Sequence, residues 1–412
     1  MRGKSFWIAT SCSAAMFLLM LSPLASARGN GFRTIHHFQP GRDGSGPYAG
    51  LISDSVGNLY GITVNGGFAG YGTIFKLTPN ANGRWSETLL YSFTGNGDGA
   101  NPQAGLILDA SGNLLGTTLG GGAQGAGTVF MLNSSRDGSW SETVLYSFTG
   151  GQDGAVPVAD LISDAHGDLF GTTLSGGSEN CVLGCGVVFE LTQGIGGSWS
   201  EKVIHSFDSQ GSDGFYPFGT LMFDVEGRLY GTTEKGGQYG DGTVFQLVQN
   251  DDGTWAESML HSFNGKDGSH PMASLIFDAQ GSLYGTTNEG GAHNLGVTFQ
   301  LTPDGKGGWD ERILHSFRRV PTDGVLPKAG LAFDKSGNLY GTTIGGGSVN
   351  DGTIFRLTPT VGDRWHETVV HSFRNRPGCN PTARLLVDPQ GVLFGTTYGC
   401  FSGEGSAFTL TP

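Results

Sequence analysis

The sequence predicts an all-β protein, a seven-bladed β-propeller with four antiparallel strands in each blade. Glycine makes up 73 of the 412 residues, and no stretch after residue 27 keeps helical apolar spacing over three turns. One motif, L-Y-G-T-T and its variants, occurs seven times at spacings of 54 to 60 residues. Each copy lies among four short segments of strand-forming residues. A tandem repeat of this length with four strands is typical of a propeller blade.

The repeat unit can be followed from strand to strand. It reads P-x-A-x-L-I-x-D-x-x-G-N-L-Y-G-T-T-x-x-G-G, then G-T-V-F-x-L-T-P and G-x-W-x-E-x-x-L-x-S-F. The glycine of L-Y-G-T-T stands at Gly61, Gly116, Gly171, Gly231, Gly285, Gly341 and Gly395. In the second full unit we predict strands at 103–109, 113–118, 127–132 and 140–148. The turn 109–112 contains Asp and Gly, which favour tight reversals.

The two ends of the repeat array predict how the ring closes. Residues 32–38 match the fourth strand of a unit, with no earlier strands before them. Residues 406–412 match the third strand, with no fourth strand after them. We therefore expect the N-terminal strand to complete the last blade in a one-plus-three arrangement. This closure removes the open sheet edges that promote aggregation.

The first 27 residues read as an export signal. Arg2 and Lys4 precede an apolar run at 14–21, then Pro23 and the small-residue cleavage site Ala25-Ser26-Ala27. We predict cleavage after Ala27, which leaves 28–412 as a single propeller domain that is secreted or periplasmic. A membrane anchor is the other interpretation. The apolar run is short for the ~20 residues that span a bilayer, so we expect no membrane span after signal removal.

The charge and the cysteines narrow the classes of partner and compartment. With 23 basic and 36 acidic residues the net charge is −13, so nucleic acid is a poor partner. We also expect the protein to be a monomer. Four cysteines follow the signal, a number compatible with disulfides in an exported protein. Cys181 and Cys185 lie in an insertion of the third blade and can close a small loop. The hairpin turn at 388–391 places Cys379 opposite Cys400 or Phe401, which predicts a Cys379–Cys400 bond. A four-thiolate zinc site is the alternative, although the two pairs lie several blades apart.

The segment 90–118 carries the string L-Y-S-F-T-G-x-x-D-G-A-N-P-x-A-G-L-I-x-D-x-x-G-N-L-L-G-T-T. In this string the sequence resembles the Gloeo/Verruco tandem-repeat family of exported bacterial proteins. The resemblance covers 32–412. It implies a secreted or surface-associated β-propeller, and it implies no defined reaction.

Most residues that recur in each unit are interpreted as construction elements. The prolines that open the first strand are Pro47, Pro102, Pro157, Pro217, Pro271, Pro327 and Pro381. The aspartates that cap the first turn are Asp54, Asp109, Asp164, Asp224, Asp278, Asp334 and Asp388. The aspartates of the Asp-Gly loops are Asp43, Asp98, Asp153, Asp213, Asp267 and Asp323, and we expect them to shape turns, with calcium binding as an alternative.

Three further repeat positions lie on the fourth strand. One is occupied by His36, Tyr91, Tyr146, His205, His261, His315 and His371, which we expect to pack between blades. The other pair is the W-x-E motif. We expect its Trp to fill the space between blades and its Glu to place a charge on the outer edge.

The functional surface is predicted on one face of the ring. The loops that enter the first strand and those between the second and third strands project there, around the channel mouth, and they vary most between units. The predicted ligand-binding side chains are Tyr48, Phe68, Tyr71, Phe218, Tyr239 and Phe401. Aromatic rings stack on sugars and peptides. We therefore expect an exported, non-catalytic binding propeller without a cofactor that recognises a polysaccharide or an extracellular protein.

The alternative is an extracellular propeller enzyme, such as a metal-dependent hydrolase, a lactonase or a lyase. The candidate catalytic residues are His270, His293, Glu289 and Asp267, all predicted on one face of the fifth blade. These residues barely depart from the repeat pattern, whereas a catalytic pair should stand out from it. The sequence contains no G-x-S-x-G, H-E-x-x-H or dinucleotide-binding motif.

Overall fold

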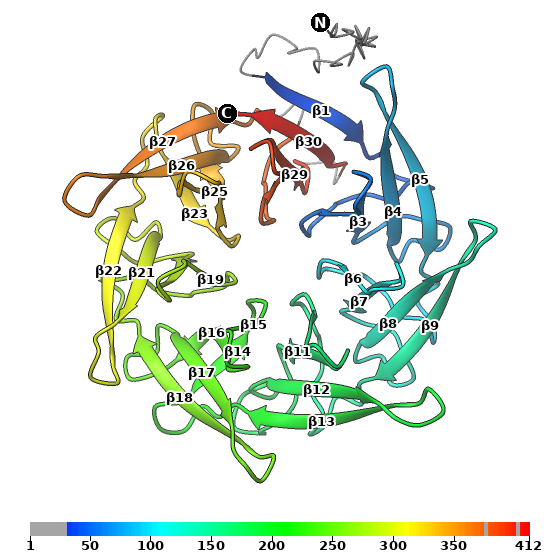
Figure 1. Ribbon diagram of the computed structural model, residues 1–412, viewed down its shortest axis with the longest axis horizontal. Coiled ribbons are helices and arrows are strands. Elements are labelled where there is room, and N and C mark those ends of the chain that lie inside the picture. The colour runs from blue at the N-terminus through cyan, green and yellow to red at the C-terminus, as the bar shows by residue number, and fades with distance from the viewer. Residues whose placement is uncertain (1–30, 375–377, 401–403) are drawn as a thin grey trace, which may run out of the picture.

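The computed structural model describes residues 31–374, 378–400 and 404–412, and in these it forms a seven-bladed β-propeller (Figure 1). Seven antiparallel sheets surround a central axis, and no helix occurs in the described residues. The predicted fold class is therefore confirmed. The described part of the chain also contains no helix with the length and apolar character needed to cross a membrane.

The strands of the first four blades follow one another in chain order. Blade one contains β2 (Ile52–Ser53), β3 (Leu59–Thr63), β4 (Thr73–Pro79) and β5 (Trp85–Ser92). Blade two contains β6 (Ile107–Leu108), β7 (Leu114–Thr118), β8 (Thr128–Ser134) and β9 (Trp140–Ser147). Blade three contains β10 (Ile162–Ser163), β11 (Leu169–Thr173), β12 (Val187–Gln193) and β13 (Trp199–Ser206). Blade four contains β14 (Gly214–Pro217), β15 (Met222–Phe223), β16 (Leu229–Gly236), β17 (Thr243–Gln249) and β18 (Trp255–Ser262).

The last three blades complete the ring. Blade five contains β19 (Ile276–Phe277), β20 (Leu283–Thr287), β21 (Val297–Pro303) and β22 (Trp309–Ser316). Blade six contains β23 (Gly324–Pro327), β24 (Ala332–Phe333), β25 (Leu339–Gly346), β26 (Thr353–Thr360) and β27 (Arg364–Ser372). Blade seven contains β28 (Leu386–Val387), β29 (Leu393–Thr397), β30 (Ser406–Thr411) and, from the other end of the chain, β1 (Gly31–His37).

Blade seven has the predicted one-plus-three composition. β1 pairs antiparallel with β30, with Phe32 opposite Leu410 and His37 opposite Ser406. Figure 1 shows the two ends of the described chain side by side in this blade. The outermost strand of the last sheet is therefore supplied by β1, the first strand in the described part of the chain.

The innermost strands are shorter than the sequence predicts. In blade two the expected strand 103–109 is reduced to β6, and the residues before it follow the channel wall outside the strand ladder. Asn101 has a φ of 54°, and Pro102 lacks the N–H that a ladder needs, so the segment diverges from β7. In blades four and six the additional strands β14 and β23 each end at this proline.

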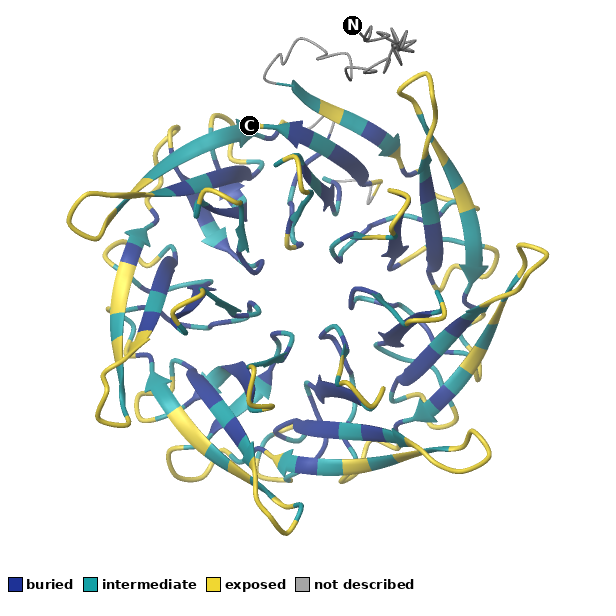
Figure 2. Cartoon of the chain, in the orientation of Figure 1, coloured by how far each residue is buried: buried dark blue, intermediate teal, exposed yellow. Residues whose placement is uncertain are grey.

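Each blade is closely packed around the second and third strands. All five residues of β3 are buried, and the first three residues of β4 are buried before burial begins to alternate along the strand (Figure 2). The glycine of L-Y-G-T-T recurs because an aromatic ring lies against it. A Cβ atom on Gly61 would lie 2.6 Å from Cζ of Phe75 and 2.9 Å from a methyl carbon of Leu51. A side chain at this position would therefore displace the ring.

Tryptophans of the fourth strands fill the space between adjacent blades, as predicted. Trp140 of β9 packs on Tyr60 of β3 with ring centroids 6.4 Å apart. Trp85 packs in the same way on Phe394 of blade seven, at 6.1 Å. These edge-to-face contacts link neighbouring hydrophobic cores, which makes the ring a continuous packed body.

Three repeat positions that the sequence analysis treated separately meet at the blade interfaces. At each of six interfaces a His or Tyr of one fourth strand contacts an Asp of the Asp-Gly loop, and a Glu of the next fourth strand lies beside that Asp. The six carboxylate clusters are His36/Asp43/Glu87, Tyr91/Asp98/Glu142, Tyr146/Asp153/Glu201, His205/Asp213/Glu257, His261/Asp267/Glu311 and His315/Asp323/Glu367.

The glutamates of the clusters are therefore not the exposed edge charges that the W-x-E motif suggested. In the second cluster the Tyr91 hydroxyl donates a hydrogen bond to Asp98 over 2.9 Å, while Glu142 is half-buried. Burial, followed by the negative charge of Asp98, raises the pKa of Glu142 to about 7. The prediction was wrong because the packing of adjacent blades covers this face of the outer strand.

The interface between blades six and seven is built differently. Phe32 faces Leu410 in β30 just as Glu87 faces Leu77 in β4, so an aromatic ring replaces the glutamate here. Phe32 stacks on His371 with ring centroids 4.0 Å apart and an interplanar angle of 6°. Burial lowers the pKa of His371 to about 4, which keeps the imidazole neutral at physiological pH.

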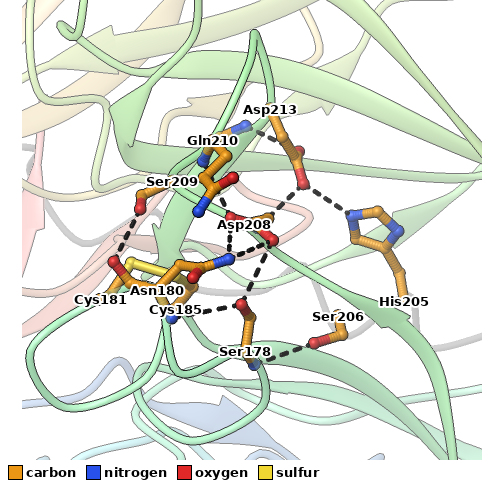
Figure 3. The surroundings of a disulfide bond; sticks show 11 residues. Ser178, Asn180, Cys181, Cys185, His205, Ser206, Asp208, Ser209, Gln210 and Asp213 are labelled. Carbon is orange, nitrogen blue, oxygen red and sulfur yellow. Dashed lines mark hydrogen bonds and ion pairs between the residues drawn. A yellow bond between two sulfur atoms is a disulfide. The ribbon is translucent and has the colours of Figure 1, made fainter.

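Both predicted disulfides are present, Cys181–Cys185 and Cys379–Cys400. The first closes a loop between β11 and β12, and Figure 3 shows how this loop is fixed to the segment that enters blade four. The Asn180 amide donates to the carboxylate of Asp208 over 2.8 Å, and the Ser209 hydroxyl donates to the Asn180 carbonyl over 2.8 Å. The disulfide and these bonds therefore join two successive blades.

Candidate functional site

A cavity of about 650 Å³ lies on the propeller axis, lined by the innermost segments of all seven blades. The backbone conformation of the residue before each recurring proline sets the course of these segments. Asn101, Val156, Tyr216, His270, Leu326 and Asn380 all have φ between 54° and 62°. The N–H of each donates to a carbonyl of the preceding blade, for example Val156 to Ala126 over 2.9 Å. This left-handed residue turns the chain into the channel, and alternate residues after the proline then face the axis.

The residues that face the axis form three layers. The first layer, one residue after each proline, consists of Tyr48, Gln103, Val158, Phe218, Met272, Lys328 and Thr382. The second layer, three residues after each proline, consists of Gly50, Gly105, Asp160, Thr220, Ser274, Gly330 and Arg384. The third layer is apolar and includes Ile52, Ile107, Ile162, Met222, Ile276 and Leu386.

In the first layer, aromatic rings converge on one lysine. The Lys328 ammonium nitrogen lies 5.4 Å from the ring centroid of Tyr48 and 5.1 Å from that of Phe218. These three residues come from blades six, one and four, so they meet across the channel mouth. Tyr48 is held at its backbone by the Thr382 hydroxyl, which donates to its carbonyl over 2.8 Å. Two of the predicted ligand-binding residues, Tyr48 and Phe218, therefore lie together at the mouth.

The second layer contains two charged residues that the sequence analysis missed. Five of its seven positions hold Gly, Ser or Thr, and the other two hold Asp160 and Arg384. A comparison of this one position between repeats would have revealed them as exceptions. Its importance becomes visible only once the structure shows that this position faces the cavity.

Asp160 is fixed to the channel wall by its neighbours. Its Oδ1 accepts a hydrogen bond from the N–H of Gly105 in blade two, and its own N–H donates to the Thr220 hydroxyl in blade four over 3.2 Å. A Cβ on Gly105 would lie 3.0 Å from the Asp160 carboxylate, so glycine leaves room for it. Burial raises the pKa of Asp160, while the Gly105 N–H and the charge of Arg384 act in the opposite direction.

Arg384 extends along the opposite part of the wall. Its Cδ atom would lie 3.5 Å from a Cβ on Gly330, so the side chain runs over a glycine of blade six. Arg384 is exposed to the lumen of the channel. Within the described residues its guanidinium has no hydrogen bond or ion pair. Five N–H donors are therefore left available for a partner from solution.

The other predicted ligand-binding residues lie outside the cavity lining. Phe68, Tyr71 and Tyr239 are 71%, 42% and 57% exposed on the loops between second and third strands. The guanidinium of Arg42 lies 5.3 Å from the Phe68 ring centroid, and the Tyr71 ring covers Gly95 in the next loop. Phe401 lies outside the described residues.

The four candidate catalytic residues are only partly brought together. His270 Nδ1 lies 3.5 Å from Glu289 and 3.0 Å from the Ser269 hydroxyl. His293 is exposed. Ser269 is 5% exposed, and its hydroxyl donates to Asp241 over 2.9 Å, so it is neither accessible nor activated by the imidazole.

Asp267, the fourth of these candidates, belongs instead to a carboxylate cluster. It lies 3.3 Å from Nε2 of His261 and accepts hydrogen bonds from Asn264. It therefore contributes to the contact between blades four and five.

Two groups of described residues have the spacing that could hold a metal ion, His315/Asp323/Glu367 and Asp164/His166/Asp168. In the first group, Asp323 already contacts the imidazole of His315 at 3.1 Å and accepts the N–H of Gly324 over 2.8 Å. Calcium binding by the Asp-Gly loops stays an untested alternative to their role in turns.

The repeat pattern decides the family. The model of the Gloeobacter/Verrucomicrobia repeat matches residues 24–245 and 220–412. The chain belongs to this repeat family. The match therefore confirms the resemblance found in the sequence, and it extends over all seven blades of this Gloeobacter/Verrucomicrobia repeat protein. A search of curated protein sequences finds no match to this repeat protein.

Solved propellers of distant sequence share the fold of the repeat protein. A Bacteroides uniformis protein assigned as a 6-phosphogluconolactonase is 14% identical with a TM-score of 0.53, covering 84% of this chain and 88% of that one. The extracellular domain of a B. thetaiotaomicron hybrid two-component system is 13% identical with a TM-score of 0.56, covering 92% and 39%. An ancestral GH74 enzyme is 12% identical with a TM-score of 0.56, covering 92% and 48%. At these identities the similarity concerns the fold.

Proposed function

We propose that this repeat-family propeller is an exported, non-catalytic binding protein that takes a saccharide at the channel mouth. The observation that carries the proposal is the meeting of Tyr48, Phe218 and Lys328 over a cavity of about 650 Å³. Aromatic faces suit the apolar faces of sugar rings. The amide of Gln103 provides hydrogen-bonding groups in the same layer, and the hydroxyls of Thr220 and Ser274 provide them one layer deeper.

The chemistry of the lining favours binding over catalysis. No histidine or cysteine lines the described cavity, and its one carboxylate, Asp160, accepts a backbone hydrogen bond and is fixed to the wall. A general acid or base must reach the reacting group, and usually a second titratable group assists it. Export is supported by the two disulfides, which persist in oxidising compartments.

A saccharide array probed with residues 28–412 tests this function. We expect binding to one class of oligosaccharide, and a loss of roughly 30-fold in affinity in the Tyr48→Ala/Phe218→Ala variant, since each ring contributes about 1 kcal/mol. The matched control is Phe68→Ala/Tyr239→Ala, which removes two exposed rings outside the cavity. Equal affinity of the first variant and the wild type for each bound saccharide would place the site elsewhere.

A further inference from the structure

The cavity has an unusual charge for this protein. The whole chain carries 36 acidic and 23 basic residues. The cavity lining reverses this balance, because its charged residues in the described chain are Lys328, Arg384 and Asp160. Lys328 occupies a position where the other repeats have uncharged side chains, and no other repeat has a cation at the position of Arg384. The blade scaffold therefore does not require them.

The two cations lie one layer apart and neither is neutralised. Within the described residues the Lys328 ammonium contacts the faces of Tyr48 and Phe218 but has no hydrogen-bond acceptor or carboxylate partner. Arg384 lies one layer deeper, also unpaired and open to the lumen. Two unpaired cations that line the same cavity add their fields there, so they attract an anion more strongly than a single surface cation does.

The one acid of the lining does not cancel this field at the mouth. Asp160 is turned toward the wall, where the Gly105 N–H donates to its carboxylate. Its interaction with Arg384 is long-range, because no hydrogen bond or ion pair joins them within the described residues. An incoming anion therefore meets Lys328 first and the fork of Arg384 second, which matches a planar carboxylate or a sulfate.

We propose that the ligand is an anionic saccharide whose acidic group enters the cavity between Lys328 and Arg384 while its ring stacks on Tyr48 and Phe218. This inference rests on the proposed function, because it names the class of saccharide that the same site takes. Carboxylate and sulfate groups share the chemistry that the two cations recognise. Uronic-acid sugars carry the first group, and sulfated sugars carry the second.

Calorimetric titration of residues 28–412 with matched oligosaccharides tests the charge of the ligand. The probes are trigalacturonate, its carboxyl-reduced neutral counterpart and a sulfated galactose trisaccharide. We expect at least one acidic probe to bind roughly tenfold more tightly than the neutral one, as for a hydrogen bond to a charged group. Equal binding of the neutral probe overturns the inference and leaves the proposed function standing. Failure of both acidic probes to bind also overturns it.

Charge variants test the site itself. Lys328→Gln and Arg384→Gln should each weaken the acidic probe about tenfold without changing the neutral probe. Asp160→Asn should leave binding unchanged or strengthen it, since it removes a negative charge. Tighter binding in Lys328→Gln and Arg384→Gln, together with weaker binding in Asp160→Asn, would overturn the inference and indicate a cationic ligand. The matched controls are Lys335→Gln in the same blade and Arg319→Gln, both exposed residues outside the lining.

Thermal unfolding distinguishes a structural role of Arg384 from a role in ligand binding. If Arg384 serves only as the counter-charge of Asp160, then Arg384→Gln lowers the melting temperature and a second change, Asp160→Asn, restores it. Our inference predicts an unchanged melting temperature together with the loss of affinity. Loss of binding in Tyr48→Ala/Phe218→Ala, but not in the charge variants, would keep the mouth as the site and reject the anionic ligand.

Discussion

Replacing one interface glutamate with glutamine should stabilise the propeller at neutral and alkaline pH. Glu142 is the suitable target because its cluster contains Tyr91 and Asp98 and no imidazole, so no histidine of the cluster titrates over the same range. Burial, together with the charge of Asp98, raises the pKa of Glu142 to about 7. In the folded state the carboxyl group therefore holds its proton more tightly than in the unfolded chain.

The sign and the size follow from linkage. Because the folded state binds the additional proton, the free energy of unfolding falls as pH rises from the unfolded value near 4.5 to about 7. A full shift of this size corresponds to roughly 3 kcal/mol, and solvent screening of a half-exposed group reduces it to about 1 kcal/mol. Glu142→Gln removes the cost of ionisation, so it should add about 1 kcal/mol at pH 8 and almost nothing at pH 5.

Calorimetry of residues 28–412 at the two pH values measures the effect. For a domain of this length we expect the melting temperature of Glu142→Gln to rise by roughly 1–2 °C at alkaline pH. Adding Glu201→Gln, in the other tyrosine cluster, should double the gain. Glu179→Gln is the control, because Glu179 is exposed. A lower melting temperature at alkaline pH, or the same gain at both pH values, would refute the reasoning.

Three further predictions concern the scaffold. Val156 has a φ of 59°, a conformation unfavourable for a β-branched residue. Val156→Asn should therefore raise the free energy of unfolding by about 1 kcal/mol in urea titrations, and Asn101→Val should lower it by a similar amount. An unchanged free energy of unfolding in Val156→Asn would mean that the turn is unstrained. A Cβ on Gly116 would lie 2.8 Å from Cζ of Phe130, so Gly116→Ala should lower the free energy of unfolding by about 1–3 kcal/mol. Gly97 has open space around it, so Gly97→Ala should leave stability unchanged. Equal melting temperatures of the two variants would contradict the packing argument. The Cys379–Cys400 bond closes a loop of 21 residues, and the Cys181–Cys185 bond closes one of 4. Replacing each pair of cysteines with serines should therefore lower the free energy of unfolding by about 3 kcal/mol for the longer loop and about 2 kcal/mol for the shorter one. The reverse order in thermal melts would argue that loop entropy is not the source of the stabilisation.

The blade architecture could be predicted because each unit repeats the same local signals. Turn residues, alternating strands and the unmatched ends of the array were sufficient for seven blades and the closure of the ring by β1. The Cys379–Cys400 pairing followed from the hairpin register of a single blade. These features depend on contacts within one repeat or between equivalent repeats.

The candidate site was harder to predict because it depends on contacts between different repeats. Lys328 meets Tyr48 and Phe218 only because three distant blades face one axis. Asp160 and Arg384 are sequence exceptions at a position whose orientation is set by the left-handed residue before each proline. Spacing within a unit does not reveal that orientation, so Asp160 and Arg384 could not be distinguished from ordinary sequence variation between repeats.

The pairing of β1 with β30 also orders events in time. Gly31 and Thr411 are partners in the ladder although 411 − 31 = 380 residues separate them in the chain. After its synthesis β1 therefore waits for β30, and blade seven cannot form before β30 has been made. A chain cut short before β30 leaves β1 without its ladder partner, so the presence of β30 is a condition for a closed ring.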